Sequence, residues 1–344
     1  MSNGHSPARV LGKDRLPRTA AAAIGAVCAA ACSTVVAQSP RDVAYPTRNI
    51  RFIVPFFPGG TPDINARMIA DKLRTRFNQP VIVDNRPGAN GSIGMSLAAK
   101  APPDGHTIVI ATVGTWAVNP YLYKLSYDTL TDFAPIIHIV SISGVLAVHP
   151  SLPAHNVKEL IALAHKRPGV LNYGSSGVGG FGHLCGALFA SLAKVDITLV
   201  PHKSQAAAVS DLMGGHIHLL FNIPVSVVPH MRSGRLRGLA VTSTKRIEIA
   251  PELPPLAEAG VPGYENTTWN AIAAPANTPQ PIIELLNREI RAVMLQPDAA
   301  AAVREQGAFV TATTPEEFHA YLRKELAKYG KLVKEAGIKP ESGS

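Results

Sequence analysis

Cysteine is nearly absent from this 344-residue chain, which contains only Cys28, Cys32 and Cys185. Because a single cysteine follows residue 37, that part of the chain cannot be stapled by an internal disulfide. Aromatic residues make up only 6% of the chain, and its lysines and arginines are scattered rather than clustered. We therefore expect neither a small disulfide-rich domain nor a nucleic-acid-binding protein.

Long apolar runs are also lacking, with one exception from Thr19 to Ala37. Four basic residues precede this run, and small residues end it, which predicts a secretory signal peptide over 1–37, cleaved near Ala37, and an exported protein. A spanning helix and a lipoprotein anchored at Cys32 are the alternatives. Removing residues 1–37 takes away four basic residues and Asp14 and lowers the formal net charge from +9 to +6.

Two glycine-rich turns stand out in the remaining chain, PFFPGGTPD (Pro55 to Asp63) and YGSSGVGGFGH (Tyr173 to His183). Each lies between a predicted strand and a predicted helix. The first turn of a helix leaves backbone N–H groups unpaired and favours negative charge, so each turn is a candidate anion site. Thr61 is the expected N-cap of the first helix. The alternative is that both turns merely connect strand to helix.

Motifs for other chemistries are missing. Neither turn matches a nucleotide-binding fingerprint, and His216 and His218 lack a convincing third metal ligand, so we expect no cofactor and no metal. Ser175, Ser176 and His183 lie close in sequence, yet GSSG is not the nucleophile elbow of a hydrolase. We therefore expect no enzyme, with a secreted hydrolase as a remote alternative.

Strands and helices alternate along the chain, which favours α/β lobes built on mostly parallel sheets. Strands are predicted at 51–54, 81–83, 107–111, 136–148, 170–173, 197–200, 218–221 and 236–242. Helices are predicted from Thr61 for about four turns and at 93–99, 157–165, 184–192, 206–213, 224–233, 281–295 and 315–336. No linker divides the chain, so it is expected to cross between lobes more than once.

An ordered set of motifs resembles one known family. PFFPGGTPDINAR, QPVIVDNRPGANGSIG, PPDGHTIVIAT, LNYGSSGVGGFGHL, VPHKSQAAAVSDLMGGHIHLLF and EAGVPGYENTTW follow one another between about Tyr45 and Gly337. Together they resemble the Bug-type solute-binding receptors of tripartite tricarboxylate transporters. No single motif is specific, but their order is.

The resemblance implies a periplasmic-binding-protein (Venus flytrap) fold with a ligand cleft between two lobes, 40–145 plus 270–344 and 146–269. It implies a monomeric receptor that captures a small carboxylate and delivers it to the membrane subunits of a transporter. A binding protein that presents its closed form to a sensor kinase is the alternative. The loops implied to contact the ligand contain or adjoin Phe57, Pro58, Gly59, Gly60, Thr61, Asp63, Asn90, Thr115, Trp116, Ser175, Ser176, Gly177, Gly180, Phe181, Ser204 and Pro224.

Several of these residues have two interpretations. Trp116 and Phe181 stand where smaller or polar residues are common in the family, which suggests an apolar pocket rim and a hydrophobic or aromatic carboxylate; alternatively both rings pack the lobe surfaces. Asp63 either orients its loop or contacts the ligand. Asn90 either forms a turn or reaches the cleft. His183 and Trp269 are each interpreted as packing residues or ligand contacts.

Overall fold

A computed structural model describes residues 45–339 of the chain. The predicted signal peptide and the alternative lipid anchor at Cys32 lie outside these residues. Among the helices in this range, none combines the length and the apolar character needed to cross a bilayer.

The first sheet has six strands in the order β11-β4-β10-β3-β1-β2. β1 pairs in parallel with β2 and β3, whereas β10 lies antiparallel between β3 and β4. The sheet is therefore mixed rather than mostly parallel, because β10 returns from the second sheet in the opposite direction. Its strands are β1 (Ile50–Val54), β2 (Val81–Asn85), β3 (Thr107–Thr112), β4 (Phe133–Ser143), β10 (Thr267–Pro275) and β11 (Ala308–Val310).

The second sheet repeats this mixed plan with five strands in the order β7-β6-β8-β5-β9. β6 pairs in parallel with β7 and β8, and β5 lies antiparallel between β8 and β9. The strands are β5 (Val145–Val148), β6 (Asn172–Ser175), β7 (Thr198–Pro201), β8 (Leu219–Asn222) and β9 (Arg237–Val241).

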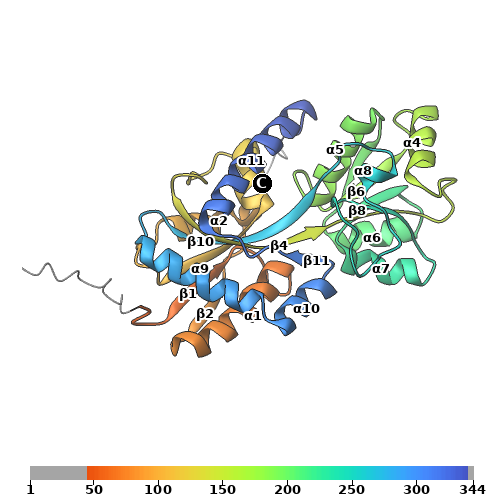
Figure 1. The fold of residues 1–344 in the computed structure, drawn as a ribbon. Helices are drawn as coiled ribbons and strands as arrows, with labels where there is room; N and C mark the ends of the chain where they lie inside the picture. The colour runs from red at the N-terminus through yellow and green to blue at the C-terminus, as the bar shows by residue number, and fades with distance from the viewer. Residues whose placement is uncertain (1–44, 340–344) are drawn as a thin grey trace, which may run out of the picture. The chain divides into compact units, whose positions relative to one another are not determined.

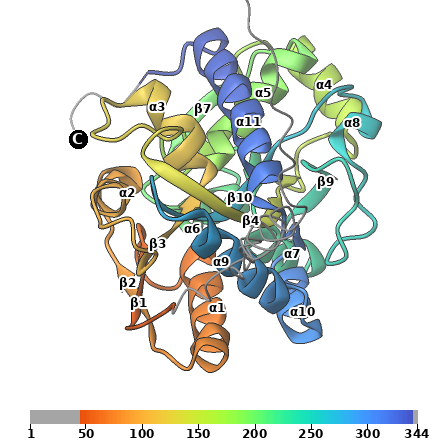
Figure 2. The same ribbon diagram turned by 60° about the vertical axis from the view of Figure 1, so that its left-hand side comes forward.

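Helices cover both faces of the first sheet (Figure 1). Alternate residues of each strand point to opposite faces, so Phe52 packs in one apolar core with α1 and α9 and Ile53 packs in another with α2 and α11. Figure 2 shows α11 lying along the sheet. The helices are α1 (Thr61–Phe77), α2 (Ser92–Ala99), α3 (Asn119–Leu122), α9 (Gln280–Met294), α10 (Pro297–Glu305) and α11 (Pro315–Glu335), with a 3-10 turn η1 (Ala89–Gly91) and a π-helical turn η2 (Gly114–Val118).

The second sheet is likewise sandwiched between helices. Leu146 of β5 packs with α4 and α5 in one core, while Val145 packs with α6 and α7 in another. The helices are α4 (Val157–Lys166), α5 (Phe181–Ala193), α6 (Gln205–Met213), α7 (Pro224–Arg232) and α8 (Leu256–Ala259).

The chain passes between the two sheets at two adjacent places. β4 ends at Ser143 and β5 begins at Val145, while the return path leads from β9 into β10. The Gly144 N–H donates to Thr242 Oγ1 over 2.6 Å, and the Ser243 hydroxyl donates to Ser143 Oγ over 2.8 Å. The two crossings are therefore bonded to each other through buried polar groups.

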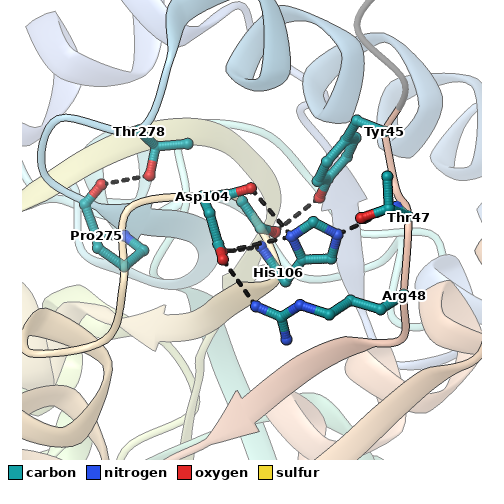
Figure 3. Close-up of polar contacts among 8 residues, drawn as sticks. Tyr45, Thr47, Arg48, Asp104, His106, Pro275 and Thr278 are labelled. Atoms are coloured by element: carbon teal, nitrogen blue, oxygen red, sulfur yellow. Dashed lines mark hydrogen bonds and ion pairs between the residues drawn. The ribbon is translucent and has the colours of Figure 1, made fainter.

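Hydrogen bonds also fix the first described residues to the base of the first sheet (Figure 3). The Tyr45 hydroxyl donates to the Gly105 carbonyl over 2.7 Å, and the Thr47 N–H donates to His106 Nε2 over 3.2 Å. Arg48 pairs with Asp104 over 2.7 Å. These contacts tie residues 45–48 to the loop before β3.

Every helix predicted from the sequence is present, with bounds that shift by a few residues. The predicted strands are present too, except that segment 136–148 forms two strands, β4 and β5, which belong to different sheets. The expected N-cap of the first helix is wrong by one residue, since Gly60 occupies that position. β10, β11, α3, α8 and α10 were not predicted. β10 is buried along nearly its whole length, so its sequence shows none of the apolar–polar alternation by which a half-buried strand is recognised.

His138 in β4 makes stability depend on pH. Burial lowers its pKa to about 4, although a hydrogen bond with the Val140 carbonyl opposes the shift. The unfolded chain takes up this proton near pH 6.5, before the native chain does, so the free energy of unfolding falls as the pH drops through this window. Between pH 7 and pH 4.5, the free energy of unfolding measured in urea should fall by about 2 kcal/mol less in His138→Gln than in the wild type. His155→Gln, at an exposed position, is the control; equal losses in the wild type and His138→Gln would contradict this assignment.

Candidate functional site

Three loops of the first sheet meet at Gly91. They follow β1, β2 and β3, all of which point the same way in the sheet. A Cβ atom on Gly91 would lie 2.5 Å from Thr115 Cγ2 and 3.5 Å from the Phe56 ring. Gly91 also has a φ of +87°. The position therefore requires glycine, and the carboxyl ends of three parallel strands converge there, where α/β proteins commonly bind ligands.

Asp63 shapes the glycine-rich loop after β1. Its carboxylate accepts hydrogen bonds from the Gly59 N–H over 3.0 Å, from Arg67 Nε over 3.0 Å and from Asn85 Nδ2 over 2.9 Å. Burial alone would raise the pKa of Asp63, but these hydrogen bonds and the Arg67 charge lower it overall. The side chain is buried and fully engaged, which supports its interpretation as a loop-orienting residue.

Replacing Asp63 is expected to disorder this loop. Asp63→Ala leaves the Gly59 N–H and the Asn85 amide without their acceptor, and we expect the free energy of unfolding to fall by about 1–3 kcal/mol. Ligand affinity should fall about tenfold because the loop is no longer held in place. Chemical unfolding and calorimetry measure the two effects. Asp71→Ala, on the exposed side of the same helix, is the control; an Asp63→Ala protein with unchanged stability would refute the role.

The N-terminus of α1 is open. Gly60 is the N-cap and no side chain caps this helix, with Pro62 in its first turn. Phe57, Pro58, Gly59 and Gly60 are all exposed, and the Phe57 side chain is 75% exposed. Backbone N–H groups at such an end attract an anion, and an exposed aromatic ring lies beside them.

The loop after β6 is held by Ser175 and His183. The Ser175 hydroxyl donates to the Gly177 carbonyl over 3.1 Å and accepts from the His183 N–H over 3.0 Å. His183 Nδ1 accepts from the Gly179 N–H over 3.0 Å. Burial lowers the pKa of His183, so the ring stays neutral and keeps this acceptor. Both side chains therefore serve the loop conformation.

The N-terminus of α5 is open in the same way as that of α1. Gly180 is its N-cap, and no side chain caps the helix. Ser176 is exposed, and Gly177, Gly180 and Phe181 are half-buried. The neighbouring helix α6 differs, because the Ser204 hydroxyl accepts from the Ala207 N–H over 3.2 Å and so caps it. Pro224 is buried at the start of α7.

The second glycine-rich loop touches α3, which packs with the first sheet, and the crossing between the sheets. A Cβ on Gly179 would lie 2.6 Å from Leu122 Cδ1, at the end of the segment that carries Thr115. The Phe181 ring lies against Gly144 of the crossing, where a Cβ would be 2.9 Å from Cε1. A ligand held at this loop is thus linked directly to the point where the chain passes between sheets.

Trp116 corrects one prediction. Its side chain has no exposed surface and packs against Phe318, Phe133 and Trp269, with ring centroids 5.1, 5.8 and 6.3 Å away. Of its two interpretations, packing is the one that this burial supports, and the indole does not form a pocket rim, because η2 turns this side chain into the core under α11.

Two other predicted contacts use their side chains internally. The Thr115 hydroxyl is buried, accepting from the Thr112 N–H and donating to the Thr112 carbonyl. Asn90 has a left-handed φ of 51° and donates to the Tyr123 hydroxyl over 2.8 Å. The turn-forming interpretation of Asn90 is the one its geometry supports.

Two asparagines end strands at these loops, and sequence reasoning missed the first of them, Asn85. Asn85 closes β2 and donates to both Asp63 and the Phe56 carbonyl. Asn222 closes β8 and accepts from the Ile223 N–H over 2.8 Å. An asparagine at the end of a strand, just before a loop, is the signal that would have found Asn85. Within residues 45–339, no group of three His, Cys, Asp or Glu side chains is arranged to hold a metal ion.

Comparisons with known proteins agree on one family. Residues 65–338 match the tripartite tricarboxylate transporter family receptor model. A protein encoded in the tcbD-tcbE intergenic region of Pseudomonas sp. (strain P51) is 36% identical over 309 residues, 89% of this chain and 92% of that protein. BugT of Bordetella pertussis is 35% identical over 86% of this chain and 91% of its own length.

Solved structures resemble the fold over most of both chains. A protein of R. palustris with adipate is 41% identical, with a TM-score of 0.76 over 86% of this chain and 99% of its own. MatC from Rhodopseudomonas palustris with bound malate is 28% identical, with a TM-score of 0.71 over 84% of this chain and all of its own.

Proposed function

We propose, from the premise that this chain belongs to the tripartite tricarboxylate transporter receptor family, that it captures a small carboxylate in the periplasm and delivers it to a membrane transporter of that type. The family consists of solute-binding receptors rather than enzymes. Two related structures hold adipate and malate, both carboxylates. The protein follows a signal peptide over 1–37, and its two lobes are 40–145 plus 270–344 and 146–269.

The open N-termini of α1 and α5 carry this proposal. α1 packs on the first sheet and α5 on the second. Neither helix is capped by a side chain, and each follows a glycine-rich loop. A carboxylate that accepts hydrogen bonds from such amides gains charge-assisted bonds of about 1.5–3 kcal/mol each. Phe57 is exposed beside one end and Phe181 half-buried beside the other, so the ligand has an apolar part. Contacts come from Phe57–Thr61 and Ser175–Phe181, while Asp63, Asn90, Thr115 and Ser204 position the loops.

Delivery requires that the ligand-bound form differ from the free form. The crossing at Gly144 touches Phe181, so a ligand at the second loop favours one arrangement of the crossing over another. A sensor kinase that recognises the same closed form is the alternative output, and genes for transporter subunits beside this one would favour uptake.

Isothermal titration calorimetry with matched ligands tests the binding step. We expect an aliphatic or aromatic carboxylate to bind and its primary amide not to bind. At a ligand concentration a hundredfold above Kd, binding should raise the free energy of unfolding by about 2.7 kcal/mol. A protein that is folded and ligand-free, yet binds amides as well as acids, would disprove carboxylate recognition. Binding restricted to small hydrophilic diacids would contradict the proposal that the ligand has an apolar part.

A further inference from the structure

A hollow lies beside the two crossings. Its volume is about 750 Å³, within the usual range for small-molecule sites. None of its lining residues belongs to the two glycine-rich loops. Its walls come from β4 and β11 of the first sheet, from α11, and from the segment Ser243–Lys245 that follows β9 of the second sheet. It is a site separate from the one proposed above.

One wall of the hollow is apolar and aromatic. Phe309 and Tyr321 are half-buried there, and the Tyr321 ring stacks on the buried His138 ring at 4.8 Å between centroids. The His138 ring is in turn held by the Val140 carbonyl at 3.1 Å. This wall suits the hydrocarbon part of a ligand.

Charges of both signs line the same hollow. None of the ion pairs found within residues 45–339 includes Lys245, Lys324 or Glu265. Glu317 differs, because its carboxylate accepts from the Thr314 N–H over 2.8 Å as part of a capping box. The hollow thus offers two lysines and one glutamate that form no ion pair within the part of the chain that the structure describes.

We propose that this hollow binds a small zwitterion with an apolar side chain, of the chemical class of the apolar amino acids. Its carboxylate pairs with Lys324 and Lys245, its ammonium group pairs with Glu265, and its side chain lies on Phe309 and Tyr321. A plain carboxylate leaves Glu265 without a partner, and a plain amine does the same to both lysines. Complementary charge of both signs therefore distinguishes the zwitterion from either.

Calorimetry on the purified protein with L-leucine, L-phenylalanine and L-methionine tests this site. At least one is expected to bind. In the Gly60→Val protein, where the carboxylate site is blocked, its analogues without the amine or without the carboxylate should bind about tenfold or more weakly; for leucine these are 4-methylpentanoate and 3-methylbutylamine. The double variant Lys324→Ala/Glu265→Gln should weaken binding at least fivefold. Lys331→Ala is the matched control, since Lys331 is an exposed lysine farther along α11, and should have no effect.

Binding must also survive loss of the first site. Gly60→Val is expected to retain amino-acid binding within twofold, which separates this hollow from the carboxylate site whether or not that site exists. Two results would overturn the proposal: no binding of any of the three amino acids at millimolar concentration, or binding that is lost in Gly60→Val and kept in Lys324→Ala/Glu265→Gln.

Discussion

Gly60→Val is expected to weaken carboxylate binding by at least a hundredfold while leaving the free energy of unfolding nearly unchanged. Gly60 has a φ of −78° and a ψ of 165°, which any residue adopts. A Cβ there meets only Pro62 Cδ at 3.6 Å. The fold therefore accepts the larger residue, but the valine methyl groups occupy the space in front of the α1 N-terminus.

The expected loss follows from the bonds that valine blocks. A hundredfold change corresponds to about 2.7 kcal/mol, which is the contribution of one to two charge-assisted hydrogen bonds. Calorimetry measures the affinity, and urea unfolding checks the fold. Gly60→Ala, which adds a single methyl group, is the graded control and should lose less. A stable Gly60→Val protein with full affinity would place the ligand elsewhere.

Gly60 also shows what sequence alone could predict. The strand and the glycines that follow it are local signals that located both open helix ends, and for α1 the proline in the first helical turn is a further signal. The role of Asp63 was harder, since its partner Asn85 comes from a different strand 22 residues away. Hydrogen bonds between loops depend on how strands are ordered in the sheet, which local patterns do not contain.

Trp116 and β10 show the same limit in the core. The sequence places tryptophan after a glycine-containing turn, which is compatible with a pocket rim. Whether the indole turns outward or inward depends on η2 and on α11, which lies about 200 residues later in the chain and covers it. β10 escaped prediction because it is buried between β3 and β4 and pairs with both.

Trp116→Ala is expected to lower the free energy of unfolding by about 3–5 kcal/mol, the usual effect of removing a buried aromatic side chain. The side chain is fully buried against three other aromatic rings, so its loss leaves a cavity at the centre of the core under α11. Ligand affinity of the fraction that remains folded should change less than threefold, because the indole has no surface on the site.

A comparison of two phenylalanine variants separates packing from hydrogen bonding in this core. The Trp116 Nε1 is buried without a hydrogen-bond partner, whereas the Trp269 Nε1 donates to the buried Glu325 carboxylate over 2.9 Å. Trp116→Phe removes an unsatisfied donor, which offsets part of its lost volume. Trp269→Phe leaves a buried carboxylate oxygen unpaired, which costs about 1.5–3 kcal/mol more. Urea unfolding of both variants measures this difference. Equal stability of the two variants would mean that the Trp269–Glu325 hydrogen bond makes no net contribution to stability. A large loss of ligand affinity in Trp116→Phe would show that the indole contributes to ligand binding.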